Sequence, residues 1–187
     1  MTRLQMPSEQ ELSPEQSVVI AEVIAGQRGK VPAPMIAWLR NPELARRAQH
    51  LGELLRYETS LAPALSEFAI LVCGKHWTSH HEWTAHKKIA LAAGVDPRTI
   101  DDIAAGRSPF LSGPLEDIVY QVSSTLLSKG KLPNALYQQG LETLGERGMV
   151  ELVGILGYYS MVALMLNAFE IGLPENFVPE LGSSSND

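Results

Sequence analysis

Residues 67–86 read EFAILVCGKHWTSHHEWTAH, and the rest of the chain is organised around this stretch. It contains four of the five histidines of the chain, its only cysteine and two of its three tryptophans. Its first half is mostly apolar, and its second half carries polar and ionisable side chains. The stretch therefore combines a segment that can be buried with groups that can hold or transfer protons.

Two helices with a break between them are expected in this region. The first runs from about Pro63 to Trp77, the break lies near Thr78 and Ser79, and the second helix extends to about Ala93. The break is inferred from Ser79-His80-His81-Glu82, a sequence that fits a capping box, in which a serine and the glutamate three residues later each bind the other's backbone N–H.

Helix-start signals recur on both sides of this region. Ser13-Pro14, Asn41-Pro42 and Asp96-Pro97 each place a capping side chain before a proline in the first turn. Towards the C-terminus, 115–127 has apolar residues at helical spacing, and 149–171 is apolar on nearly every side. The expected helices cover about 14–25, 35–39, 42–56, 63–77, 80–93, 97–104, 115–127, 133–144 and 149–171. Because no segment alternates convincingly as a strand would, the fold class is all-α.

One domain accounts for this length. A chain of 187 residues lies within the usual size of a single domain. We predict a single all-α domain over 13–175, a flexible N-terminus over 1–12 and a disordered tail over 176–187 that ends in glycine, serine and asparagine.

Composition limits the partners. The net charge of −6 and the absence of a basic cluster argue against nucleic acid. A single cysteine, Cys73, excludes an intramolecular disulfide and any Cys-x-x-Cys motif, which suits a reducing cytoplasm. The N-terminus has no apolar core of a secretory signal. We therefore expect a cytoplasmic protein that acts on a small molecule.

One segment requires a test for membrane insertion. Residues 152–169 carry no charge and are long enough to span a bilayer. However, the segment contains Tyr158, Tyr159 and Asn167, and no lysine or arginine adjoins it. We interpret it as a helix buried in the core or in a subunit interface, and we predict no membrane association.

Three residues form the candidate acid/base site. Glu82 and His86 lie one helical turn apart, so the carboxylate could fix the imidazole tautomer and raise its pKa. Glu67 lies in the apolar helix, where burial would favour its protonated form. His81 is a possible fourth member. In the alternative interpretation, Glu67 only bridges helices and Glu82–His86 is a solvated surface pair.

No metal or cofactor is expected. His81 and His86 are five residues apart, which places them about 140° apart around a helix axis, too far to share one ion. Glu-x-x-His pairs on separate helices, as a di-iron bundle would need, do not occur in this region. His76 and His80 are interpreted as structural, and Cys73 as an inert buried thiol.

The spacing of these residues resembles the carboxymuconolactone decarboxylase and alkylhydroperoxidase D superfamily. Its peroxidase branch carries a glutamate, two cysteines and a histidine at the positions of Glu67, Ser79, Glu82 and His86. The sequence around Glu82-Trp83-x-x-His86 is similar to the decarboxylase branch, with His81 in place of a tyrosine. A faint internal repeat between 66–77 and 150–161 also agrees with this resemblance.

The resemblance implies an alkylhydroperoxidase D-like helical fold with two related helical units, assembled as a homo-oligomer, trimer or hexamer. It implies cofactor-free decarboxylation of a small lactone or carboxylated ring-cleavage product, with His86 as general acid/base, Glu82 as its orienting carboxylate and Glu67 as a relay acid. Two alternatives remain: a non-catalytic or ligand-binding member of the superfamily, and a thiol-dependent antioxidant activity through Cys73.

Overall fold

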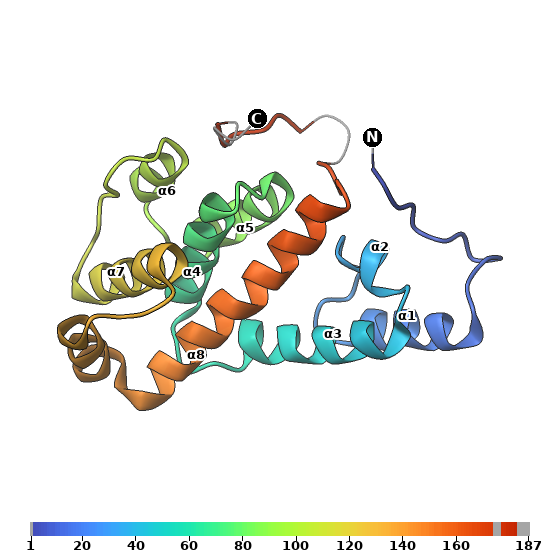
Figure 1. Ribbon diagram of the computed structural model, residues 1–187, viewed down its shortest axis with the longest axis horizontal. Coiled ribbons are helices and arrows are strands. Elements are labelled where there is room, and N and C mark those ends of the chain that lie inside the picture. The colour runs from blue at the N-terminus through green and yellow to red at the C-terminus, as the bar shows by residue number, and fades with distance from the viewer. Residues whose placement is uncertain (1, 174–176, 183–187) are drawn as a thin grey trace.

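The computed structural model of the chain describes residues 2–173 and 177–182, and this part contains helices and loops but no strand (Figure 1). The all-α prediction is confirmed. The helices are α1 (Pro14–Ala25), α2 (Met35–Trp38), α3 (Pro42–Tyr57), α4 (Pro63–His76), α5 (His80–Ala92), α6 (Pro97–Ala104), α7 (Pro114–Lys129) and α8 (Asn134–Ala168).

The predicted caps begin three of these helices. Before α1, the Gln16 N–H donates to Ser13 Oγ at 3.2 Å and the Ser13 N–H donates to Gln16 Oε1 at 2.9 Å, so this capping box is complete. The side chains of Asn41 and Asp96 likewise accept backbone N–H groups at the starts of α3 and α6. These contacts satisfy donors that the first helical turn would leave unpaired.

The break between α4 and α5 lies where the sequence placed it, but the capping box there is wrong. Thr78 adopts a positive φ of 47°, which turns the chain between the two helices. Ser79 makes no capping hydrogen bond with its side chain, and neither carboxyl oxygen of Glu82 has a hydrogen-bond partner among the described residues. Both side chains are buried. Glu82 therefore points into the core, and it does not bind the end of its own helix.

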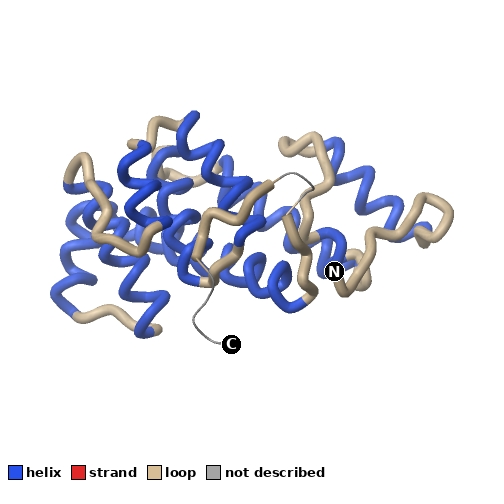
Figure 2. The backbone as a smooth tube through the Cα atoms, turned by 90° about the horizontal axis from the view of Figure 1, so that it is seen from above, coloured by secondary structure: helices blue, strands red, loops and turns tan. Residues whose placement is uncertain are grey.

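Helix α4 is the centre of the fold. It packs against α5, α7 and α8, and α8 runs diagonally between this group and the group of α1, α2 and α3 (Figures 1 and 2). Almost every residue of α4 from Leu65 to Gly74 is buried. The largest fully buried side chains of α4 and of the helices packed on it, α5 and α8, include Phe68, Ile70, Leu71, Trp83, Leu152 and Ile155. A buried central helix explains why the first half of the 67–86 stretch is apolar all round.

The two helices predicted at 133–144 and 149–171 form one kinked helix, α8. Gly145 interrupts its helical geometry with φ 70° and ψ 172°. By length and composition alone α8 could cross a membrane, but half of its most apolar window is buried inside the chain. Its inner face, with Leu152, Ile155 and Leu166, belongs to the core, as expected for a core helix. The opposite face stays exposed.

The terminal segments lie beside the helices. Arg3 forms an ion pair with Glu170 at 2.5 Å. Residues 177–182 approach α5, where Glu180 pairs with Lys87 and Leu181 is buried. The prediction of a disordered tail over 176–187 falls in part on residues 176 and 183–187, which lie outside the described residues, as does residue 1 of the N-terminus.

Gly145→Ala should destabilise the fold by about 1–3 kcal/mol, because its φ and ψ are accessible almost only to glycine. No neighbouring atom would lie within 4 Å of the added methyl group, so the cost would come from the backbone alone. Gly157→Ala, in the same helix with equally open space, should be neutral or stabilising by about 0.5–1 kcal/mol. Urea unfolding of both variants measures the difference, and equal stabilities would contradict the assigned kink.

Candidate functional site

Glu67 of α4 and His86 of α5 meet in the interior. The Nδ1 atom of His86 lies 2.6 Å from Glu67 Oε2, and both side chains are buried. Glu67 Oε1 is 3.8 Å from Nε of Arg56, in α3, which makes an ion pair on its other side. Because an ionised carboxylate can only accept hydrogen bonds, Nδ1 carries the proton and donates it to Glu67. This tautomer leaves the lone pair of His86 on Nε2.

This pairing corrects the predicted role of Glu82. The sequence paired Glu82 with His86 through their four-residue spacing, whereas the structure pairs His86 with Glu67. The reason is tertiary: α4 passes so close to the start of α5 that Glu67 reaches His86 from the neighbouring helix. The approach occurs at Gly74, where a side chain would meet the backbone of Trp83 at 3.6 Å.

Glu82 has a different property. Burial raises the pKa of Glu82 well above its usual value, and the nearby Ser79 hydroxyl opposes this shift only in part. Neither carboxyl oxygen accepts a hydrogen bond from the described residues. Burial therefore favours the protonated form of Glu82, the form that the sequence predicted for Glu67. Glu67 instead faces the guanidinium of Arg56 and the Nδ1–H of His86.

Tyr159 is a site residue that the sequence did not identify. Its ring meets the ring of His86 edge to face, with centroids 4.9 Å apart. Its hydroxyl is buried without a partner among the described residues, and burial, followed by the charge of Glu67, raises the pKa of Tyr159 well above its usual value. The available signal was the pair Tyr158-Tyr159 within an apolar helix, since a buried hydroxyl normally has a partner.

A cavity of about 850 Å³ joins these groups. Three of the four predicted residues, His81, Glu82 and His86, line it, and Glu67 supports His86 from behind. His81 Nδ1 lies 3.0 Å from the carbonyl oxygen of Gly172, which fixes its ring near the C-terminal end of α8. The remaining lining comes from several elements and includes Arg28, Lys30, Trp38, Arg56, Lys88, Tyr158, Tyr159, Val162, Leu166, Leu173 and Phe177.

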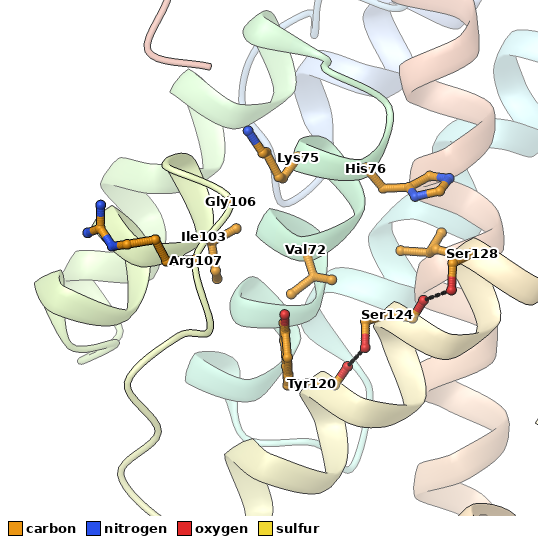
Figure 3. A pocket seen from close by; sticks show the side chains of 10 residues that line it. Val72, Lys75, His76, Ile103, Gly106, Arg107, Tyr120, Ser124 and Ser128 are labelled. Carbon is orange, nitrogen blue, oxygen red and sulfur yellow. Dashed lines mark hydrogen bonds between the residues drawn. The ribbon is translucent and has the colours of Figure 1, made fainter. Parts of the chain in front are cut away.

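A second, smaller cavity of about 320 Å³ lies between α4, α6 and α7 (Figure 3). Several of its polar groups already have partners. Lys75 Nζ donates to the carbonyl oxygen of Ala104, and Arg107 pairs with Asp102 at 2.7 Å. The serine hydroxyls along α7 donate to carbonyl oxygens one turn back, as the dashed lines of Figure 3 show. The larger cavity, with its unpaired Glu82 and Tyr159, is the better candidate site.

Cys73 lies behind Glu82 and takes no part in the cavity lining. Burial, followed by the charge of Glu82, raises the pKa of the Cys73 thiol to about 12. Such a thiol is almost entirely protonated at neutral pH and is a poor nucleophile. His76 is exposed and does not line the large cavity. Partial burial of its ring lowers its pKa. Across 2–173 and 177–182, no three histidine, cysteine, aspartate or glutamate side chains come together to hold a metal.

Comparison with known proteins bears on the fold. No family model matches the chain, and neither does any curated protein. A crystal structure described as an alkylhydroperoxidase AhpD core, an uncharacterized peroxidase-related protein from Ralstonia eutropha JMP134, superposes with a TM-score of 0.77. The match covers 93% of each chain at 14% sequence identity. The chain has the alkylhydroperoxidase D-like fold. At this identity the likeness establishes the fold, and the activity must be argued from the site.

Replacing Glu82 by glutamine should change how stability depends on pH. Because the pKa of Glu82 is raised, the folded state binds more protons than the unfolded state above about pH 4.5, so the carboxyl group costs stability as pH rises. Relative to the wild type, Glu82→Gln should gain up to about 1.4 kcal/mol per pH unit above that value, until the folded-state pKa is reached.

Urea unfolding between pH 4 and 8 measures this gain, with Glu9→Gln, at an exposed glutamate, as the control. A difference between Glu82→Gln and wild type that stays constant with pH would show that Glu82 is ionised in the folded protein.

Proposed function

We propose that the chain is a cofactor-free acid/base enzyme that decarboxylates a small lactone or carboxylated ring-cleavage product, as carboxymuconolactone decarboxylases do. The observation that carries the proposal is the juxtaposition of an imidazole held by a carboxylate, His86 with Glu67, and a protonated carboxyl group, Glu82, on one cavity. Groups whose pKa values are pushed apart by their surroundings are typical of acid/base sites.

The proposed reaction begins with loss of CO2 from a carbon conjugated to a carbonyl group. The bond between that carbon and the carboxylate breaks, and its electron pair moves onto the carbonyl oxygen as an enolate. The hydroxyl of Tyr159, unpaired in the free protein, can donate a hydrogen bond to this oxygen. Hydrogen-bond donors that meet developing negative charge in a dry site are usually a large contribution to catalysis.

The enolate carbon then takes a proton. Glu82 holds one at neutral pH and lies on the cavity, so it is the proposed donor. The glutamate left behind recovers a proton from water through His86, whose Nε2 accepts it while Nδ1 stays bonded to Glu67. Over one turnover the substrate carboxylate and one proton become product and CO2, and the protein returns to its starting state. No electron acceptor is required.

Thiol peroxidase chemistry is not supported by the site. That mechanism needs a thiolate and a second, resolving thiol. The chain has one cysteine, its pKa is raised to about 12, and it lies outside the cavity. Ser79 and Glu82 occupy the two positions at which the resemblance would place cysteines. The words "peroxidase-related" belong to the structural neighbour, which is itself uncharacterized.

A non-catalytic member that binds a ligand in the same cavity is the second candidate. The size of the cavity favours it, because 850 Å³ is large enough for a drug-sized ligand whether or not chemistry follows. The two candidates differ in the fate of the ligand, since a binding protein would release it unchanged.

We also propose that the chain forms a homo-oligomer, a trimer or hexamer. The outer face of α8 supports this proposal. Val150, Val153 and Leu164 recur there at helical spacing and are about half exposed or more, with Val150 at 72%. Leu51 and Leu54 of the adjacent α3 are exposed as well. Exposed apolar side chains that recur along one helix face are well suited to contact with another copy.

His86→Ala should lower turnover about a hundredfold to ten-thousandfold, because it removes the group that carries protons between water and the site. Turnover is measured as CO2 release from a panel of carboxylated unsaturated lactones. His76→Ala, at an exposed imidazole outside the cavity, should behave as wild type. Circular dichroism confirms that both variants fold. Full activity in His86→Ala would refute the mechanism, and binding of the panel without turnover by wild type would favour the ligand-binding candidate.

Val150→Glu should dissociate the proposed oligomer without unfolding the chain, because the side chain is already 72% exposed in the single chain. A buried, unpaired carboxylate at a subunit contact costs several kcal/mol. Sedimentation velocity should show wild type at several times 20.4 kDa and the variant at that mass. Val178→Glu, on an equally exposed valine of the C-terminal segment, should leave the assembly intact. A monomeric wild type would disprove oligomerisation.

A further inference from the structure

The large cavity has an unusual balance of charge for this protein. The whole chain carries a net charge of −6. The cavity lining, by contrast, contains six basic side chains and one acidic side chain: Arg28, Lys30, Arg56, His81, His86 and Lys88 against Glu82. Glu82, whose pKa is raised by burial, is the one acidic group of this lining. A concave site lined by one sign of charge attracts ligands of the opposite sign.

Arg28 differs from the other cations of the cavity. Arg56 is committed to Glu67, and its guanidinium also lies over the ring of Tyr57 at 5.1 Å. Lys30 and Lys88 are exposed to solvent. The Nε and Nη2 atoms of Arg28 are buried and, within the described part of the chain, have no hydrogen-bond partner. No carboxylate of that part lies within ion-pair distance of Arg28.

The surroundings of Arg28 hold it at the cavity. Arg28 belongs to the loop between α1 and α2 and approaches α3 at Gly52. A β-carbon on Gly52 would lie 2.6 Å from Arg28 Nη2 and 2.1 Å from the hydroxyl of Tyr158, so only glycine leaves room for both groups. Burial raises the pKa of Tyr158, and the positive charge of Arg28 and hydrogen bonding with its guanidinium oppose the shift, so, among the described residues, the Tyr158 hydroxyl is the one protein group beside Arg28 that can share its N–H groups with a ligand.

We propose that Arg28 binds a carboxylate of the ligand, at the end of the cavity opposite the acid/base pair. A buried guanidinium without a partner is costly, and a planar carboxylate satisfies two of its N–H groups at once. The Tyr158 hydroxyl lies beside Arg28, the Tyr158 ring meets the Tyr159 ring with centroids 5.2 Å apart, and Tyr159 in turn meets the ring of His86. The ligand is therefore an acid whose charged group lies beyond these rings while its reacting carbon lies beside His86.

This inference builds on the proposed function, because it identifies the class of ligand for the same cavity. Under this assignment the charge that Arg28 binds is separate from the carboxylate that leaves as CO2. An ion pair with the departing group would stabilise the ground state and slow its loss.

Equilibrium binding tests the assignment without requiring turnover. The probes are muconolactone, an unsaturated lactone with a carboxymethyl arm, its uncharged methyl ester, and inorganic phosphate, each titrated calorimetrically. Wild type should bind the acid more tightly than the ester. Arg28→Gln should weaken binding of the acid about tenfold to a hundredfold and leave ester binding within about twofold. Arg28→Lys should recover part of the loss, since it restores the charge but not the planar fork.

Lys30→Gln is the matched control, because Lys30 lines the same cavity but is exposed. It should change acid binding by no more than about twofold. An equal loss in Lys30→Gln and Arg28→Gln would overturn the assignment in favour of a general electrostatic field. Wild type that binds acid no better than ester would overturn it as well, and phosphate bound more tightly than the acid would overturn the choice of carboxylate.

The same variants separate this inference from the proposed reaction. Acid binding that depends on Arg28 in a wild-type protein without decarboxylase activity would defeat the proposed function alone. Decarboxylation of the lactone acid with normal acid binding in Arg28→Gln would defeat the inference alone.

Discussion

The hydrogen bond between Glu67 and His86 is the interaction on which the site depends. A carboxylate in the middle of a buried helix is unfavourable unless it is paired and hydrogen-bonded. Glu67 meets this requirement with two partners from two other helices, Arg56 of α3 and His86 of α5. The same contacts fix the rotamer and tautomer of the imidazole. One buried charge thus ties three helices together and orients the group proposed to carry protons.

The burial of Glu82 complements this arrangement. The start of α5 lies against α4 at Gly74, so the first turn of α5 faces the interior. Glu82 in that turn has no hydrogen-bond or ion-pair partner among the described residues, whereas Glu67 has Arg56 and His86, so the two carboxyl groups lie in different surroundings although both are buried. Neighbouring carboxyl groups with different environments can serve as acid and base in one fold. Here the difference follows from which helices face each carboxyl group.

The sequence predicted the positions of the helices well, and the side-chain contacts between helices less well. Local signals are strong at Ser13, Asn41 and Asp96, where a cap precedes a proline, and the structure confirms those helix starts. The sequence also singled out Glu67, Glu82 and His86, because polar side chains in an apolar stretch require an explanation, and the structure brings these three residues to one cavity. Helix packing decides which carboxylate contacts His86. The four-residue spacing on α5 predicted Glu82, whereas the observed partner is Glu67 of α4. Tyr159 was missed for the same reason, since it reaches His86 from a helix more than 70 residues further along the chain.

The fold separates the placement of the site from its chemistry. A turn between two packed helices brings residues 79 and 82 against the interior beside His86, and their side chains decide what can react there. Two thiols at those positions would give redox chemistry, whereas this chain has a hydroxyl and a protonated carboxyl group. The thiol of Cys73 lies on α4, where it is buried and protonated, with its Sγ 3.5 Å from the hydroxyl oxygen of Ser160. A likeness of fold to a peroxidase-related protein is therefore compatible with chemistry that moves protons and no electrons.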